Sequence, residues 1–347
     1  MKRLWHHSLF FDVMGTLYRY VLFIFQHQTN TAMKVKTIIF YLSILAVLAT
    51  TACSNKKESK EQVDKLTIGV MSSMDYLPLA VAQKSGFFAD EGVEVEIRKF
   101  YSANERDAAL QSNNLDGTIL DYTGGAIQLS GGIPIQFTSQ CDGTFVLMTA
   151  QNSNFNSVSD LKDKKIAISR NTVIDFCTDM IFRQSAGGAI EYEAIEINKI
   201  PLRLEMLNNS KIDATMLPEP FVSIAKRDGN RGIISMDDLG VKITGIAFLQ
   251  KAIEEKPEAL RKMYRAYNKA VVEINSKSTE ELKDVLVKEV GFPEDALALL
   301  ILPHFSSAQL PQTSDMNKVE EWLKEKNLIK ADFDISTLTA PGFIPQQ

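Results

Sequence analysis

The sequence contains few cysteines, three in 347 residues. Three cysteines are too few for the disulfide framework that stabilises many small secreted proteins. The chain also lacks an excess of basic charge, because its formal net charge at neutral pH is −5. A nucleic-acid-binding surface requires a clustered basic face, so this balance argues against nucleic acid as a partner. The remaining composition is typical of a globular protein, and the chain is long enough for two domains.

A short apolar stretch near the N-terminus has the features of an export signal. Residues 33–36 carry two lysines, and residues 37–51 form an apolar run that is too short for a comfortable bilayer span. The run is followed by Ala52-Cys53 and then by a polar segment. This pattern resembles a bacterial lipoprotein signal, in which the cysteine after a small residue is lipidated and becomes the new N-terminus. We therefore expect a lipid anchor at Cys53, with a plain secretory signal or a membrane anchor as the alternative.

The segments on either side of this signal have different roles. A complete signal with its own methionine starts at Met33, so we expect translation to begin there and residues 1–32 to be an upstream extension that is not translated. Residues 33–53 then form the signal peptide. Residues 54–64 are charged and polar, which is typical of a flexible tether between a membrane and a folded domain.

Strands and helices alternate along the folded part. Residues 66–71 show the period-2 pattern of a buried strand, and a polar loop leads from them to Pro78, which suits the first turn of a helix. A second series of the same kind begins at Ser157. From Pro257 the pattern is helical, with further helices expected over 280–290, 294–302 and 315–325. This alternation predicts an α/β fold with a parallel or mixed sheet in each unit.

The loops after the strands are the candidate binding site, since ligands of open α/β sheets bind beyond the carboxyl ends of the strands. Some of these residues have a second interpretation as helix caps, in particular Asp121. Cys141 and Cys177 lie close to two of the loops, and in an oxidising compartment the alternative is that they pair. A disulfide between the lobes would block opening, so we expect two buried thiols. The candidate ligand-binding residues are Ser73, Met74, Asp75, Tyr76, Ser102, Asp121, Tyr122, Thr123, Gly124, Gln140, Arg170, Asn171, Thr172 and Glu219.

The side chains of these loops favour a small nitrogen-bearing or heterocyclic ligand. Arg170 is the only basic residue among them, whereas five are acidic: Asp75, Asp121, Asp142, Asp175 and Glu219. Flat rings suited to stacking are supplied by Tyr76, Tyr101, Tyr122 and Phe176. The alternative is an anion held by Arg170 and by the free N–H groups of helix N-termini. We expect no cofactor and no metal.

An ordered set of short motifs resembles the substrate-binding proteins of bacterial ABC importers, in particular the group that serves nitrate, sulfonates, taurine and thiamine-precursor pyrimidines. Each motif is weak alone, but together they cover most of residues 66–267. Asn113-Asn114 and Asp163 replace glycines that are usual in this group. The motifs are GFFADEGVEV (86–95), ALQSNNLDG (109–117), SVSDLKDKKIA (157–167), LNNSKIDATMLPEP (207–220) and KPEAL (256–260).

The resemblance implies a type II periplasmic-binding-protein fold, with two βα lobes joined by a two-strand hinge and a ligand cleft between them. Lobe one would comprise residues 65–149 and 242–347, and lobe two residues 150–241. It also implies a monomeric protein of the cell envelope that delivers a nutrient, for example a pyrimidine thiamine precursor, to a permease and an ATPase. The binding alternative is an alkanesulfonate, taurine or nitrate.

An enzymatic alternative comes from the yeast-type pyrimidine synthases of thiamine biosynthesis, which share this fold. Those enzymes use histidine and a pyridoxal-linked lysine, whereas residues 66–303 contain no histidine. A lipoprotein signal would also place the chain outside the cytoplasm. We therefore expect a binding protein and not an enzyme.

Replacing Cys53 by serine should abolish lipid attachment and yield a soluble or uncleaved protein. Lipidation with several acyl chains gives stable membrane binding that a single chain does not. Fractionation of cells and mass spectrometry of the mature N-terminus measure the change. A cleaved Cys53→Ser product that stays on the membrane as before would contradict the assignment.

Overall fold

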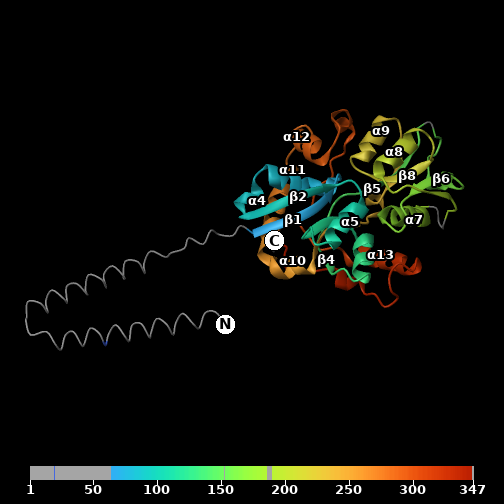
Figure 1. Ribbon diagram of the computed structural model, residues 1–347. Helices are drawn as coiled ribbons and strands as arrows, with labels where there is room; N and C mark the ends of the chain where they lie inside the picture. The colour runs from blue at the N-terminus through green and yellow to red at the C-terminus, as the bar shows by residue number, and fades with distance from the viewer. Residues whose placement is uncertain (1–18, 20–63, 152, 186–189, 346–347) are drawn as a thin grey trace, which may run out of the picture. The chain divides into compact units, whose positions relative to one another are not determined.

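Two five-stranded sheets organise the folded part of the chain (Figure 1). The computed structural model describes Arg19 and residues 64–151, 153–185 and 190–345. The predicted upstream extension, the signal with Cys53 and residues 54–63 of the predicted tether lie outside the described residues. We propose that each sheet, together with the helices that cover it, acts as one lobe, and we call these lobe one and lobe two.

The sheet of lobe one has the strand order β2-β1-β3-β10-β4, and β10 runs antiparallel to both of its neighbours. In β1 the alternating residues Leu66, Ile68 and Val70 are fully buried, as their period-2 pattern predicts. The strands are β1 (Asp64–Met71), β2 (Val93–Phe100), β3 (Gly117–Asp121), β4 (Ile135–Gln140) and β10 (Thr244–Leu249).

Helices cover this sheet because each has one apolar face. The longest, α11 (Pro257–Asn275), begins with a proline at its first position and packs against α3 and β1 with Leu260, Met263, Tyr264 and Tyr267 buried. The other helical segments of lobe one are η1 (Met74–Tyr76), α3 (Leu77–Lys84), α4 (Phe87–Asp90), α5 (Ala103–Gln111), α6 (Tyr122–Ser130), α10 (Gln250–Glu255) and α12 (Lys283–Val285).

The sheet of lobe two has the order β7-β6-β8-β5-β9. Its elements are β5 (Phe145–Thr149), η2 (Val158–Leu161), β6 (Lys165–Ile168), α7 (Val173–Ser185), β7 (Glu193–Glu196), α8 (Ile200–Asn208), β8 (Ala214–Pro218), α9 (Phe221–Arg227), β9 (Arg231–Ser235) and η3 (Asp237–Leu239). Strand β5 pairs antiparallel with β8 and β9. Residues 145–149, which the sequence analysis placed in lobe one, make their strand hydrogen bonds within the second sheet, and we therefore assign them to lobe two.

The C-terminal part is less regular than the sequence predicts. The helix predicted over 280–290 is present from Lys283, where α12 continues into the π-helix η4 (Leu286–Val290), but 294–302 contains only the 3-10 helix η5 (Glu294–Leu299). Gly291, at φ 87°, ends the first of these in a left-handed conformation that glycine adopts without strain. Pro293 and Pro303 flank the second, and each lacks the amide donor that a continuing helix needs. Helix α13 (Thr313–Glu325) and η6 (Ile335–Leu338) complete the chain.

Helix α13 joins the two lobes. Trp322 of α13 packs edge-on against Phe176 of α7, with ring centroids 5.6 Å apart, and its Nε1 donates to Asp179 at 2.9 Å. Both rings belong to a hydrophobic cluster that also contains Phe137 of lobe one and Ile166 of lobe two. Separating the lobes on this side would expose that shared apolar surface to water, which costs about 25 cal/mol of free energy for each Å² exposed. The α13 side is therefore the fixed side of the pair.

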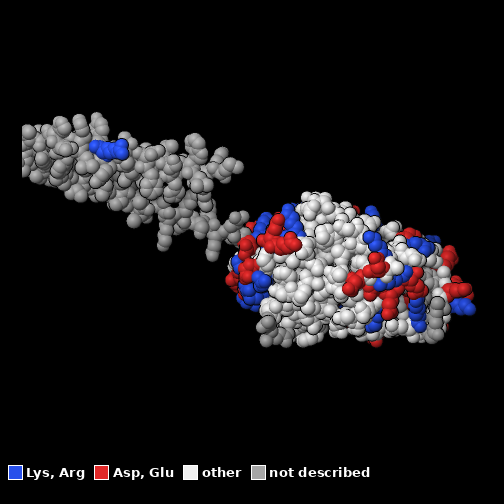
Figure 2. Space-filling view, turned by 90° about the horizontal axis from the view of Figure 1, so that it is seen from below, with Lys and Arg blue, Asp and Glu red and all other residues white. Residues whose placement is uncertain are grey.

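On the face shown in Figure 2, charged side chains gather in two groups with a broad uncharged region between them. Blue and red atoms are mixed in both groups, so this face carries no basic surface of the kind that binds nucleic acid. Among the residues described, no helix is both long and apolar enough to cross a membrane.

Gly117 at the start of β3 should not tolerate a side chain. A Cβ at this position would lie 2.5 Å from Cδ1 of Phe248 and 2.6 Å from the carbonyl oxygen of Ala247. We expect Gly117→Ala to lower the free energy of unfolding by about 1–3 kcal/mol through overpacking, measured by urea denaturation.

The control is Gly131→Ala at the end of α6, where φ is −79°. There the nearest atom to a new Cβ, the carbonyl oxygen of Ile127, is 3.2 Å away. The change at Gly131 should stay within about 0.5 kcal/mol. Equal effects of the two substitutions would show that β3 has room that these distances do not allow.

Candidate functional site

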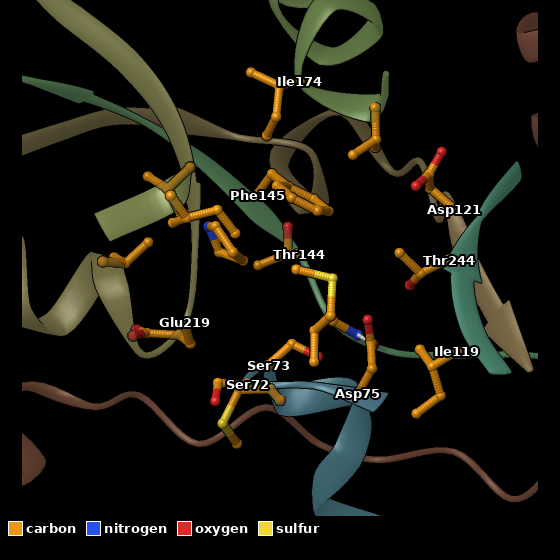
Figure 3. A pocket seen from close by; sticks show the side chains of 18 of the residues that line it. Ser72, Ser73, Asp75, Ile119, Asp121, Thr144, Phe145, Ile174, Glu219 and Thr244 are labelled. Atoms are coloured by element: carbon orange, nitrogen blue, oxygen red, sulfur yellow. Dashed lines mark hydrogen bonds between the residues drawn. The ribbon is translucent and has the colours of Figure 1, made fainter. Parts of the chain in front are cut away.

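A cleft of about 450 Å³ lies between the lobes and is lined by residues of both. In Figure 3, Ser72, Ser73 and Asp75 lie along one side of it and Ile174 lies opposite. Glu219 of lobe two lies on the other side of the cleft from Asp121 and Thr244 of lobe one. The walls come from strand ends and the loops that follow, which is the position expected for a ligand site in an α/β fold.

Half of the sequence-predicted residues line this cleft. They come from loops that are far apart in the sequence, and the fold brings them together around one cavity. Their inclusion supports the strand-end argument. These residues are Ser73, Met74, Asp75, Ser102, Asp121, Thr172 and Glu219.

Three of the four rings predicted to stack on a ligand, those of Tyr76, Tyr122 and Phe176, are buried and do not line the cleft. Tyr76 is 1% exposed and Tyr122 is fully buried, and each belongs to a hydrophobic cluster. Tyr122 packs edge-on against Phe137 at 4.9 Å between centroids. The two tyrosines are buried because the helices begin directly at these positions, with Tyr122 as the first residue of α6. Aromatic surface in the cleft comes from Tyr101, the fourth predicted ring, and from Phe145, which was not predicted.

The remaining predicted residues support the backbone near the cleft without lining it. Thr123 Oγ1 and the Gly124 amide, the latter at 2.7 Å, donate to Oδ1 of Asp121. Gln140 is buried at the end of β4. The Asn171 amide donates to Asp175 at 3.1 Å. Arg170, expected to be the only base of the site, is exposed and pairs with Glu196 at 3.3 Å.

Three of the carboxylates in the cleft already have protein partners. Asp121 caps α6 through the bonds just described, and the Ser306 amide donates to Asp142 at 2.8 Å. Glu219 accepts from both the amide and the hydroxyl of Ser223, each at 3.0 Å, and so caps α9. Burial also raises the pKa of the Glu219 carboxyl. Because these carboxylates accept hydrogen bonds within the protein, they give less support for a nitrogen-bearing ligand than their number suggests.

Asp75 is buried beside the segment that crosses between the lobes. Its Oδ1 accepts the Gly143 amide at 2.6 Å. Burial raises the pKa of Asp75 to about 6, and the nearby Asp142 adds to this rise, whereas the Gly143 amide and Lys242 oppose it. The charged form of Asp75 is therefore costly in the folded protein.

Arg203 is the main residue that the sequence analysis missed. It belongs to α8, is 1% exposed and lines the cleft. Its Nη1 donates to the Ile197 carbonyl oxygen at 2.9 Å, but Nε and Nη2 have no hydrogen-bond partner among the described residues. Burial lowers the pKa of Arg203 to about 10, so the group still carries its charge at neutral pH.

The spacing of apolar residues in the sequence places Arg203 on the buried face of its helix, which could have identified it. Within α8 the neighbouring Leu202 is 45% exposed while Arg203 is buried, the reverse of what hydropathy favours. An arginine on the buried face of a helix, in phase with Leu204 and Leu207, indicates a group kept for a purpose other than stability. A second buried base, Arg106, also lines the cleft.

Arg106 differs from Arg203 in being bonded within the protein. Its Nη1 donates to the Ile119 carbonyl oxygen at 3.2 Å and its Nε to Asp107 at 2.8 Å. Other cleft residues that the sequence analysis did not name as ligand contacts include Ser72, Thr144, Asn198, Lys226 and Thr244.

The cysteines and acidic groups suggest no other chemistry. Cys141 and Cys177 are free and buried, as predicted, and burial raises the pKa of both thiols. Within the described ranges, no group of three or more histidine, cysteine, aspartate or glutamate residues could hold a metal ion.

Comparison with known families agrees with this architecture. Residues 73–281 match the family described as NMT1/THI5 like. The chain belongs to this family. The match spans more than half of the chain and confirms the resemblance seen in the short motifs. A comparison with curated proteins finds no match.

Solved structures with the same fold include binding proteins and an enzyme. The periplasmic aliphatic sulphonate binding protein SsuA from Escherichia coli shares 16% identity at a TM-score of 0.66, over 82% of this chain and 94% of that one. The periplasmic nitrate-binding protein NrtA from Synechocystis PCC 6803 shares 15% identity at a TM-score of 0.63, over 80% of this chain and 85% of that one. The desulfurization enzyme DSZB shares 12% identity at a TM-score of 0.61, over 81% of this chain and 97% of that one. These likenesses confirm the predicted periplasmic-binding-protein fold.

Asp75→Asn should stabilise the protein at neutral and alkaline pH. Because the folded-state pKa of about 6 lies above the ordinary 3.8, the carboxylate costs stability above pH 6 and nothing below pH 3.8. The difference corresponds to about 2–3 kcal/mol at pH 7.5. Urea unfolding from pH 4 to pH 8 measures it.

The exposed Asp332→Asn provides the control, and its unfolding curve should follow that of the unmodified protein at each pH. A gain of Asp75→Asn that persists undiminished at pH 4 would mean that the effect does not come from the charge.

Proposed function

We propose that this protein is the extracytoplasmic solute-binding lipoprotein of an ABC importer. In this proposal it captures one small molecule between its lobes and presents it to a permease and its ATPase. The family membership, the two-lobed fold and the cleft between the lobes support this role. The fold alone does not distinguish binding from catalysis, since the same fold occurs in an enzyme.

We further propose that the ligand carries an anionic group, and Arg203 is the observation that supports this choice. A charged guanidinium that is buried with two nitrogens unbonded costs several kcal/mol unless a counter-charge reaches it. Among the described residues, the carboxylate whose charge acts on Arg203 is that of Glu196, which is exposed and pairs with Arg170. A sulfonate, nitrate or carboxylate in the cleft would supply the missing acceptors. The anion that the sequence analysis assigned to Arg170 is thus reassigned to Arg203.

The nitrogen-bearing heterocycle stays a second candidate because of the cleft's apolar walls. Phe145 and Tyr101 offer rings, and Met74, Ile119 and Ile174 add apolar surface. A flat neutral ring would be held by such walls. This candidate leaves Arg203 without a counter-charge, and we therefore rank it below the anion.

The substitution Arg203→Met tests the anion directly. It removes the charge and retains much of the side-chain volume, so the empty protein should be at least as stable as before. Loss of a charged hydrogen bond of about 1.5–3 kcal/mol should weaken anion binding about tenfold to more than a hundredfold.

Ligands are found by a melting-temperature screen of alkanesulfonates, taurine, nitrate, carboxylates and pyrimidines, in which a hundredfold excess over Kd contributes about 2.7 kcal/mol. Arg170→Met is the matched control, because it removes an exposed arginine and should leave binding unchanged. Pyrimidines that stabilise the unmodified protein and Arg203→Met equally, with no effect of any anion, would refute the anion and favour the heterocycle.

A further inference from the structure

One segment of lobe one runs along the cleft and reaches lobe two. We call residues 294–306 the strap. Near its start, η5 packs against α9 of lobe two, and in Figure 1 this red-orange segment lies beside α9 at the top of the view. Near its end, Ser306 donates to Asp142 in the segment that crosses between the lobes. Between these points Ile301 and Pro303 line the cleft.

The strap is fixed to lobe one by its buried side chains. Leu297, Leu300 and Phe305 belong to the hydrophobic cluster that contains the core of lobe one. Ile301, however, is 79% exposed although it is apolar and faces the cleft. An apolar side chain left exposed at the edge of a ligand cavity gains burial when the cavity is filled or narrowed.

A charged pair holds the strap against lobe two. Nη1 of Arg227, in the last turn of α9, donates to both carboxylate oxygens of Asp295, at 3.0 and 3.1 Å. The pair lies at the surface, where salt screens it and its contribution is small. A free-energy contribution of this size can shift the balance between two positions of the lobes, and the pair can still break readily.

The opposite side of the cleft is held in a different way. There α13 shares a buried cluster with both lobes, and the Lys242 amide in the second crossing segment donates to Asp315 of α13 at 3.0 Å. Figure 1 places α13 at the bottom of the view and the contact between η5 and α9 at the top. The lobes are thus joined by a buried hydrophobic cluster on one side and by a surface ion pair on the other.

We propose that the strap is a gate for ligand exchange, with Arg227 and Asp295 as its latch. When the pair breaks, lobe two rotates away about the α13 side and the cleft opens beside Ile301. When it forms, the strap closes the cavity. This rests on the two-lobed closure of the proposed function but is independent of the ligand's chemistry.

The test measures the distance between the lobes without a ligand. Spin labels are placed on cysteines introduced at exposed Gln83 in lobe one and exposed Asn209 in lobe two, while Cys141 and Cys177 stay buried. Asp295→Asn should lower the ratio of closed to open molecules about two- to fivefold. Molar salt should have the same effect on the unmodified protein and little further effect on the variant.

Asp284→Asn is the matched control, because its side chain is 65% exposed against 67% for Asp295 and it pairs with Lys84 and Lys288 within lobe one. The control should keep the distances of the unmodified protein. Arg227→Glu should open the protein, and adding Asp295→Arg should restore closure. If Asp295→Asn gives the distances of the control, or if the exchanged pair fails to restore closure, the latch is refuted while the proposed ligand class stays untouched.

Discussion

The shared hydrophobic cluster around α13 is the constraint on which the cleft depends. Trp322 and Phe176 bury their rings between the lobes, so any motion of one lobe against the other must leave this contact closed. An interior at normal packing density does not stretch, and it therefore acts as a fixed side about which the lobes rotate. The cleft opens on the other side, where a surface ion pair and the strap make the contact. The cleft therefore opens on the side where the hydrophobic core does not continue from one lobe to the other.

Charge in the cleft is distributed unevenly between satisfied and unsatisfied groups. The carboxylates of Asp121, Asp142 and Glu219 are fixed by backbone amides and hydroxyls, and they order the loops that form the walls. Arg203 retains unbonded nitrogens. The net chemistry of a site is therefore not the sum of its residue types, because an acceptor that caps a helix has little left for a ligand. The hydrogen-bond partners of these groups, and not the number of acidic residues, are what support the proposed anionic ligand.

Much of the fold followed from local patterns, and the failures have a common cause. Strand β1 was predicted from its period-2 pattern, and α11 from the proline at its first position, Pro257. The sheet to which β5 belongs could not be predicted, since pairing partners are chosen by tertiary packing. Tyr76 and Tyr122 were placed in the cleft because a loop was expected where a helix begins, and the first turn of that helix directs their rings into the core. Arg203 was missed because the site was sought only in the loops after the strands, whereas Arg203 lies within a helix.

These observations explain how a ligand can move the lobes. A ligand shifts an equilibrium between open and closed states only by the difference between its affinities for the two. Arg203 belongs to lobe two, whereas Ser73 and Thr244 belong to lobe one, and all of them line the same cavity. A molecule that binds Arg203 in the open protein gains the contacts of lobe one only when the cleft narrows. In the proposed function, an anion relieves the cost of the unpaired guanidinium and the additional contacts stabilise closure, so the buried charge that destabilises the empty protein would favour the closed one.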